Sequence, residues 1–215
     1  MVKLESLIDH TILKPDATWK DIERLCAEAV QNRFFGVCVN PCWVKAAVSL
    51  LTGEDVKVIS VVGFPLGAND SRVKMSEIEC VLSNGADEVD MVMNIGFFKS
   101  GYFDRVLEEI RWAKNICGNR VLKVIIETPL LSNGEKEKAS LLVEEGGGDF
   151  VKTCTGFFGG VKLEDVKLLR RVLSKNVKIK ASGGIRTRSF ALALVKAGAD
   201  RLGASRSLDI LRQSD

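Results

Sequence analysis

Eight short runs rich in β-branched residues alternate with amphipathic segments along the whole chain. The runs cover residues 7–11, 35–39, 56–62, 88–93, 121–127, 150–153, 177–181 and 201–204. Segments with apolar residues near helical spacing lie between them, at 20–31, 71–83, 103–116, 135–145, 163–173 and 189–197. Eight strand–helix units in 215 residues predict an α/β protein, a single TIM-type (β/α)8 barrel domain over residues 1–215.

The main alternative to the barrel is an open, doubly wound sheet. Such a sheet often carries a Gly-x-Gly-x-x-Gly turn after its first strand, where it binds a dinucleotide. No such motif follows residues 7–11. The number of strands and the absence of this motif therefore favour the barrel.

Composition narrows the class of function. Lys and Arg exceed Asp and Glu by 31 minus 28, a formal charge of +3, which is too small to indicate nucleic-acid or membrane-surface binding. The first residues lack the apolar segment of a signal peptide, and no apolar run approaches the length of about 20 residues that spans a bilayer. We expect a cytoplasmic protein that acts on a small molecule.

The six cysteines show no paired framework, and His10 is the single histidine, so the sequence predicts free thiols and no metal site. Cys38 and Cys42 could form a redox pair, but Pro41 lies between them and the spacing is not Cys-x-x-Cys. Packing of Cys38 within a strand is the simpler interpretation.

Two lysines stand where strands are expected to end. Lys152 follows the apolar pair Phe150 and Val151 and precedes a turn with Gly156. Lys180 lies next to the end of the run 177–181, shortly before Gly183 and Gly184. Burial and a neighbouring like charge both lower the pKa of a lysine, by up to about 3 to 5 units in full burial. A neutral amine is a nucleophile toward aldehydes, so the pair indicates Schiff-base chemistry.

A weak internal repeat places other residues in the same frame as Lys152. The stretches 85–90, 147–152 and 198–203 each begin with Gly-Ala-Asp or Gly-Gly-Asp and end at Asp90, Lys152 and Gly203. Alternate strands of a barrel contribute to one interior layer, so these three positions should share a level. A helix stop that leads into a strand would also explain the glycines.

Alternation along the strands predicts a charged barrel interior. Alternate residues of a strand point to the same side of the sheet. Three pairs of charged residues should therefore point inward from the fourth, fifth and seventh strands: Glu88 and Asp90, Lys123 and Glu127, and Lys178 and Lys180. Lysines and carboxylates are rarely buried unless paired. We expect a compensating network at the carboxyl-terminal mouth from Asp90, Lys123, Glu127, Lys152 and Lys180. Ion pairs that only fill the barrel explain Glu88, Lys123 and Lys178 equally well.

The same mouth offers backbone N–H groups to an anion. Gly183 and Gly184 follow the seventh run, and Gly203, Ala204, Ser205 and Arg206 end the eighth. These loops form the usual phosphate site of a barrel enzyme. Arg206 could contact the anion or lie on a solvated turn.

Seven motifs resemble the deoxyribose-phosphate aldolases, class I lyases on a TIM barrel. They are LIDHT at 7–11, VCVNP at 37–41, GFPLG at 63–67, GADEVDMV at 85–92, KVIIET at 123–128, KTCTG at 152–156 and KASGGIRT at 180–187. The resemblance implies reversible cleavage of 2-deoxy-D-ribose 5-phosphate to D-glyceraldehyde 3-phosphate and acetaldehyde, without a cofactor. It implies that Lys152 forms the imine, that Lys180 perturbs the pKa of that amine and transfers protons, and that Asp90 donates and accepts protons through water.

The resemblance also implies a set of substrate contacts. They are Asp9, Thr11, Cys38, Lys123, Thr155, Gly156, Gly183, Gly184, Gly203, Ser205 and Arg206. His10 should point away from the site. Three departures from the family pattern lie near the expected phosphate: Cys154 in place of serine, a loop at 157–160 that is one residue short, and Arg206 in place of a second serine.

Two other functions fit the same residues. Another Schiff-base barrel aldolase would use Lys152 with a ketone donor, and a non-catalytic phosphosugar-binding barrel would use the lysines only to neutralise an anion. We also expect a homo-oligomer, a dimer or tetramer. Phe97, Phe98, Tyr102 and Phe103 are candidates for its contact, although they could instead cover a barrel end.

Overall fold

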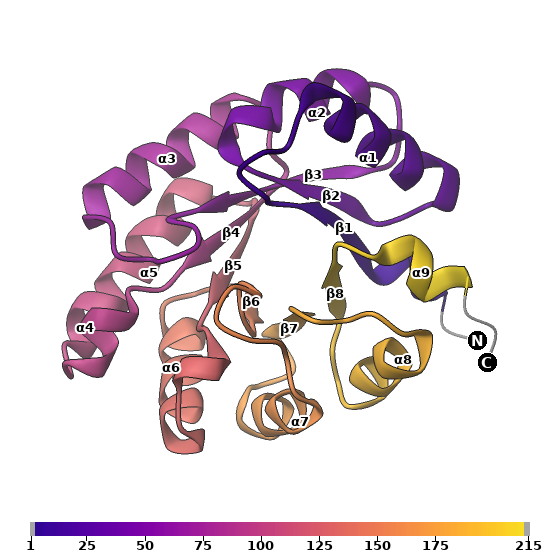
Figure 1. The fold of residues 1–215 in the computed structure, drawn as a ribbon. Helices are drawn as coiled ribbons and strands as arrows, with labels where there is room; N and C mark the ends of the chain where they lie inside the picture. The colour runs from indigo at the N-terminus through magenta and orange to yellow at the C-terminus, as the bar shows by residue number, and fades with distance from the viewer. Residues whose placement is uncertain (1–2, 213–215) are drawn as a thin grey trace.

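Eight parallel strands close a barrel in chain order in the computed structural model, which describes residues 3–212 (Figure 1). The strands are β1 Ile8–Ile12, β2 Gly36–Val39, β3 Lys57–Val62, β4 Glu88–Val92, β5 Val121–Ile125, β6 Phe150–Lys152, β7 Lys178–Ser182 and β8 Arg201–Ala204. Strand β1 pairs with both β2 and β8, with Asp9 opposite Gly36 on one side and Gly203 on the other. The predicted (β/α)8 barrel is therefore confirmed and the open sheet is excluded.

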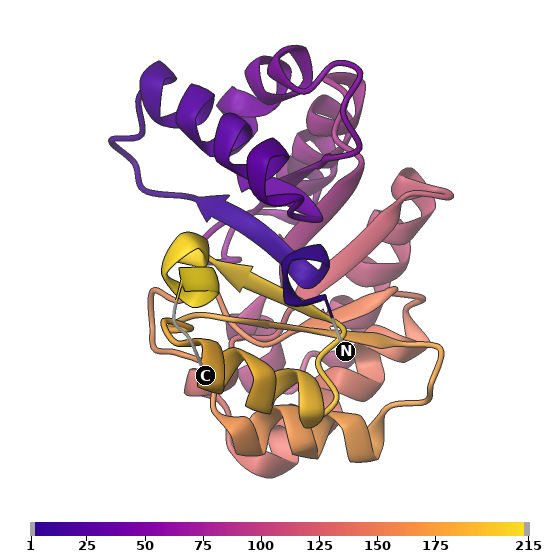
Figure 2. The ribbon, with the colours of Figure 1, turned by 90° about the vertical axis from the view of Figure 1, so that its right-hand side faces the viewer.

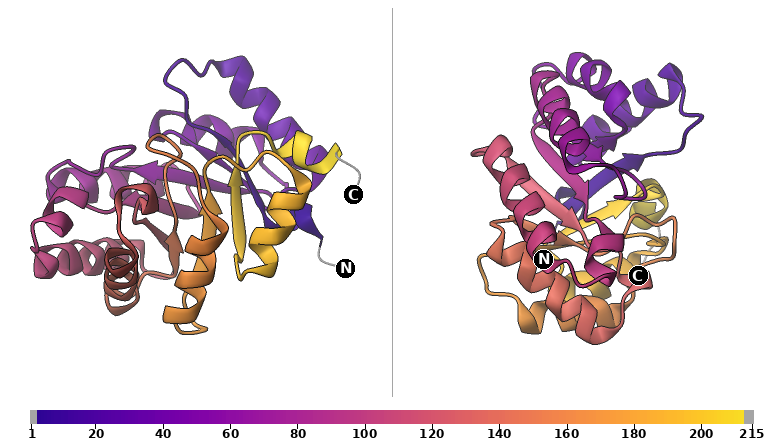
Figure 3. Two further views of the ribbon diagram at one scale, coloured as in Figure 1. Left: turned by 60° about the horizontal axis from the view of Figure 1, so that its bottom comes forward. Right: turned by 90° about the vertical axis from the view of Figure 1, so that its left-hand side faces the viewer.

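Helices surround the strands as an outer ring (Figures 1, 2 and 3). They are α1 Trp19–Asn32, α2 Val44–Leu50, α3 Ser71–Ser83, α4 Ile95–Lys99, α5 Phe103–Cys117, α6 Asn133–Glu145, α7 Leu163–Val172, α8 Arg188–Lys196 and α9 Ser207–Arg212, with short 3-10 helices at Leu4–Leu7, Pro41–Trp43 and Thr128–Leu130. Helices α2 and α4 were not predicted, because seven and five residues give too few turns for a clear apolar period. None of the helices within residues 3–212 is long and apolar enough to cross a membrane.

Side-chain caps fix where the long helices begin. Thr18 accepts a hydrogen bond from the Asp21 N–H while the Asp21 carboxylate accepts one from the Thr18 N–H, and Ser132 and Glu135 repeat this capping box at α6. Each box satisfies two backbone donors that an isolated helix start would leave unpaired. These caps place α1 and α6 within about two residues of their predicted starts.

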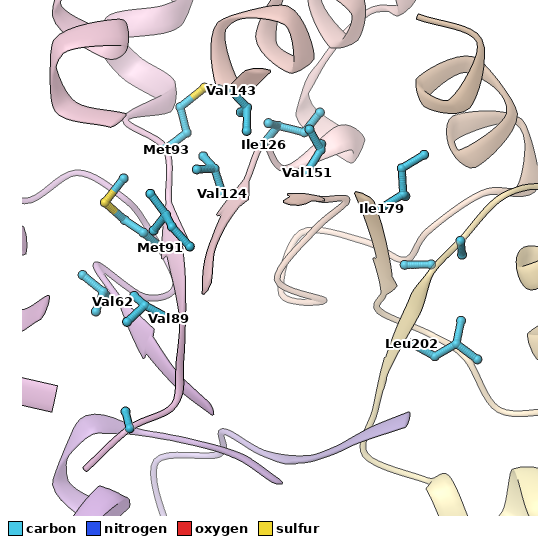
Figure 4. Close-up of a cluster of buried hydrophobic side chains, with 14 of the residues drawn as sticks. Val62, Val89, Met91, Met93, Val124, Ile126, Val143, Val151, Ile179 and Leu202 are labelled. Atoms are coloured by element: carbon cyan, nitrogen blue, oxygen red, sulfur yellow. The ribbon is translucent and has the colours of Figure 1, made fainter. Parts of the chain in front are cut away.

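The larger apolar core lies between the strands and the helices, and a small second cluster of Cys38, Ile59 and Val61 lies inside the barrel. Val89 and Met91 of β4, Val124 of β5 and Ile179 of β7 are fully buried on the helix side of their strands (Figure 4). Residues of the other parity point into the barrel, as strand geometry requires. Because the helices cover the apolar face, the inner face is free to carry charge.

Candidate active site

Six charged side chains form a closed ring inside the barrel. Starting from Asp90, the ring continues through Lys123, Glu88, Arg201, Asp9 and Lys180 and returns to Asp90. Glu88 Oε2 makes two contacts: it lies 2.5 Å from Lys123 Nζ and 3.4 Å from Arg201 Nη1. Arg201 Nη1 lies 3.0 Å from Asp9 Oδ1, and Asp9 Oδ2 lies 2.5 Å from Lys180 Nζ. Asp90 completes the ring through Oδ1 to Lys123 at 2.8 Å and Oδ2 to Lys180 at 2.7 Å.

Charge alternates around this ring. Each of its three cations contacts two carboxylates, and each of its three carboxylates contacts two cations. All six side chains are at most 9% exposed, where an unpaired charge would be strongly unfavourable. The ring is therefore electrically neutral on its own.

Lys152 is a seventh charge attached to the outside of the ring. Its Nζ lies 2.8 Å from Asp90 Oδ2, the oxygen that Lys180 also contacts, and its side chain is 4% exposed. Within residues 3–212, Asp90 is the one carboxylate at ion-pairing distance from Lys152. An ammonium at this position has no counterion that the ring does not already use.

The carboxylates control the protonation of the ring. Burial alone would lower the pKa of Lys180, but Asp9 and Asp90 raise it above its ordinary value. Burial alone would raise the pKa of Asp90, but Lys123, Lys152 and Lys180 hold it well below its usual range. The sequence predicts two repelling charges at Lys152 and Lys180, whereas the structure places the Asp90 carboxylate in contact with both and favours an ammonium at Lys180.

Aromatic rings and a glycine shape the interior around the charges. The guanidinium of Arg201 lies 3.2 Å from the centroid of the Phe35 ring, and Lys123 Nζ lies 5.8 Å from that of Phe150. A Cβ at Gly203 would come within 3.1 Å of Lys180 Cε. The same Cβ would lie 2.9 Å from Ser182 Cβ, so Ser182 and Lys180 together favour a glycine at the third position of the sequence repeat.

A cavity of about 650 Å³ lies at the carboxyl-terminal ends of β1, β6, β7 and β8, and Lys152 contributes to its lining. Its lining includes eight of the residues predicted to bind substrate: Thr11, Thr155, Gly156, Gly183, Gly184, Gly203, Ser205 and Arg206. It also includes eight residues outside the set of substrate contacts that the resemblance implies: Ile12, Leu13, Lys14, Phe157, Ser182, Ile185, Arg186 and Ala204. A volume of this size suits a small ligand such as a phosphorylated sugar.

Three residues predicted to bind substrate lie below the cavity instead of on its wall. Asp9 and Lys123 are fully buried in the ring, where each neutralises two opposite charges. Cys38 packs with Ile59 and Val61, and burial raises the pKa of its thiol. Register explains the places of Asp9 and Lys123, because Thr11 and Ile125 follow them as the last inward residues of β1 and β5.

Glycines with left-handed backbone form one end of the cavity. Gly183 has φ 91° and Gly184 has φ 75°, conformations that favour glycine. A Cβ at Gly183 would lie 2.7 Å from Cys154 Sγ, whose thiol donates to the Ser182 carbonyl at 2.8 Å. Burial raises the pKa of Cys154 to about 12, so this thiol acts as a packing group and not as a nucleophile.

Three positive side chains also line the cavity. Lys14, Arg186 and Arg206 contribute to its lining. Arg206 Nε donates to Asp209 Oδ2 at 2.7 Å, which holds the guanidinium at the rim. Arg186 could have been identified in the sequence, since it follows the Gly183–Gly184 pair by two residues.

Glu127 differs from its predicted place in the inner network, and Lys178, which was predicted on the inner face, lies at one end of the barrel. Strand β5 ends at Ile125, and Glu127 has a left-handed backbone with φ 56°. Its carboxylate accepts the Thr155 N–H at 3.1 and 3.2 Å, and burial raises its pKa. Lys178 begins β7, so it lies exposed at the amino-terminal end of the barrel, 5.6 Å from the Phe150 ring.

His10 faces the helices, as expected. Its ring lies 2.7 Å from Glu28 Oε2 and 2.9 Å from Ser207 Oγ, away from the cavity. Across residues 3–212, no three His, Cys, Asp or Glu side chains are grouped so as to hold a metal ion.

The chain is similar to known aldolases over nearly its full length. The family model described as DeoC/LacD family aldolase matches residues 4–212. The deoxyribose-phosphate aldolase of Brevibacillus brevis is 48% identical over 211 residues, covering 98% of this chain and 96% of that protein. The enzyme of the same name from Coprothermobacter proteolyticus is 50% identical over 208 residues, covering 96% and 95%.

A solved structure of such an aldolase has the same fold. The deoxyribose phosphate aldolase from Aeropyrum pernix, described as a unique tetrameric structure, superimposes with a TM-score of 0.89 at 34% identity. The match covers 97% of this chain and 89% of that one. The chain is therefore similar to these aldolases in sequence as well as in fold.

Proposed function

Because the chain belongs to the DeoC/LacD family of aldolases, we propose that it cleaves 2-deoxy-D-ribose 5-phosphate through an imine on Lys152. The products are D-glyceraldehyde 3-phosphate and acetaldehyde, and the reaction is reversible. One observation carries the assignment of Lys152: it is the cation outside a neutral ring of six buried charges, and it lines the cavity.

The ring explains why Lys152, and not a neighbour, is the nucleophile. Lys123 and Lys180 each contact two carboxylates, so loss of a proton from either would leave the ring negative. Loss of a proton from Lys152 leaves the ring neutral. A neutral Lys152 amine can attack an aldehyde carbon in the cavity, which is the first step of imine formation.

The imine then serves as the electron sink for carbon–carbon cleavage. Acetaldehyde has two carbons, so the bond between C2 and C3 of the open-chain sugar breaks as the C3 hydroxyl loses its proton. The electron pair forms an enamine on Lys152, which is protonated at C2 and hydrolysed by water to release acetaldehyde and the amine. Asp90 lies in hydrogen-bond contact with both lysines, so it and Lys180 are suited to exchange these protons.

The glycine end of the cavity is suited to hold the phosphate. Gly183, Gly184, Arg186 and Arg206 line the same cavity as Lys152. A phosphate bound there would place the rest of a five-carbon chain toward the amine.

Borohydride trapping tests the proposal. Reduction in the presence of acetaldehyde, followed by peptide mass spectrometry, should place one ethyl adduct on Lys152, and Lys152→Ala should abolish it. Lys178→Ala is a matched control, because this lysine is exposed on the next strand and should leave labelling unchanged. Active protein without an adduct would contradict the imine. Neither adduct nor turnover would favour a binding-only barrel, and preference for a ketone donor would favour another aldolase of the Schiff-base type.

We also propose a homo-oligomer in the cytoplasm. The Aeropyrum pernix relative is described as tetrameric, and Tyr102 and Trp112 expose 54% and 44% of their surface near Phe97. All six cysteines are free thiols, a state typical of reducing compartments. Sedimentation velocity of the purified protein would measure its mass directly.

A further inference from the structure

Glu88 and Arg201 complete the charged ring at the end of the barrel remote from the cavity. Each is the first residue of its strand, so both lie toward the amino-terminal end, while Lys152 lies at the last residue of β6. Neither side chain lines the cavity. Their link to Lys152 runs through the ring: Glu88 by way of Lys123 and Asp90, and Arg201 by way of Asp9, Lys180 and Asp90.

The groups that face Lys152 can be counted element by element. The ring members come from β1, β4, β5, β7 and β8, and the inward residues of β3, Ile59 and Val61, carry no charge. Strand β2 contributes Cys38, whose buried thiol has a raised pKa and so stays neutral. Glu127 lies beyond β5, and burial raises its pKa too. Lys14, Arg186 and Arg206 line the same cavity as Lys152, and Lys57 and Lys178 are exposed at the first positions of β3 and β7. These five cations stay the same in every variant below, and the ring supplies the buried charges around Lys152.

We propose that Glu88 and Arg201 are positioning residues that set how readily Lys152 gives up its proton, by fixing the net charge of the ring. This inference rests on the proposed imine chemistry. With both present, the ring is neutral. Without the charge of Arg201, the ring would carry one negative charge that a Lys152 ammonium would balance. Without the charge of Glu88, the ring would carry one positive charge that repels the same ammonium.

The two changes must therefore act in opposite directions. Buried charges are weakly screened by salt. Two unit charges roughly 10 Å apart, at an effective dielectric constant of about 20, shift each other's pKa by about one unit. Damage to packing cannot produce this result, because it lowers activity without moving the pH profile in opposite directions for neighbouring substitutions.

The experiment measures the acid limb of the kcat/KM profile, where protonation of the free enzyme stops the reaction. Glu88→Gln should move the limb to lower pH, and Arg201→Met should move it to higher pH, each by about one unit. The double variant should return the limb to within about 0.3 units of the starting position, since it restores a neutral ring. Glu88→Asp and Arg201→Lys keep the charges and should keep the limb in place.

The outcome is separable from that of the proposed function. Borohydride adducts on Lys152 in every variant would support the imine whatever the profiles show, and a wild-type protein without adduct would overturn the imine itself. Adducts together with unmoved limbs, or with limbs that move in the same direction, would overturn this inference alone. Because Gln is isosteric with Glu, Glu88→Gln decides the matter even if Arg201→Met does not fold.

Discussion

Lys152 and Lys180 donate hydrogen bonds to the same oxygen, Asp90 Oδ2, at 2.8 and 2.7 Å. Lys180 also contacts Asp9, whereas Lys152 shares its one carboxylate oxygen with a neighbour. The sharing matters for the proposed reaction, because a protonated imine on Lys152 would carry the same positive charge as the ammonium. Asp90 can therefore stabilise the charged intermediate without any rearrangement of the ring.

Asp90→Asn should impair both stability and catalysis. The amide keeps the size of the side chain but leaves Lys123, Lys152 and Lys180 without their shared carboxylate. Breaking such a buried network costs about 3 to 5 kcal/mol of unfolding free energy, and loss of proton transfer lowers kcat/KM by about 10² to 10⁴. Urea unfolding and steady-state assays measure these effects, with the exposed Asp55→Asn as control. Activity within about threefold of wild type would exclude a role for Asp90 in proton transfer.

Glu127→Gln should change how stability depends on pH. Burial raises the pKa of Glu127 above 4.5, so its contribution to stability is full below about pH 4.5 and is lost as the pH rises through the folded-state value. Gln cannot ionise. The Tm of the variant relative to wild type should therefore increase from about pH 4 to about pH 8. Glu23→Gln on the exposed face of α1 should show no such trend. A constant difference would mean that Glu127 ionises freely in the folded protein.

The alternation of strand residues predicted much of the site, but it did not predict the contact that closes the charged ring. It identified the inward parity of Glu88, Asp90, Lys123 and Lys180 correctly. The contact of Asp9 with Arg201 joins residues 192 positions apart and depends on the register between β1 and β8, which periodicity does not encode. Glu127 was placed on the inner face because β-branched residues continue to Ile126, whereas its left-handed backbone ends the strand earlier.

Gly183→Ala should weaken phosphate binding selectively. The new methyl group would strain a backbone with φ 91° and press within 2.7 Å of Cys154 Sγ. We expect kcat/KM for deoxyribose 5-phosphate to fall by at least about tenfold, while the rate of trapping with acetaldehyde changes by less than about threefold. Gly53→Ala is the matched control, since Gly53 also has a positive φ, 86°, but lies in open space. Equal losses with both substrates would place the effect at Lys152 instead of at the phosphate.

Arg206→Gln separates the two interpretations of this arginine. If the guanidinium contacts the phosphate, loss of a charge-assisted hydrogen bond of about 1.5 to 3 kcal/mol should raise KM for deoxyribose 5-phosphate by about 10- to 100-fold. KM for unphosphorylated deoxyribose should not change, and the effect should shrink at high salt because the site lies at the rim. Arg111→Gln is the control, because Arg111 is also exposed and paired with a carboxylate, Glu145 at 3.1 Å. An unchanged KM for the phosphorylated sugar would show that Arg206 only pairs with Asp209, and Arg186 would then become the cation to substitute.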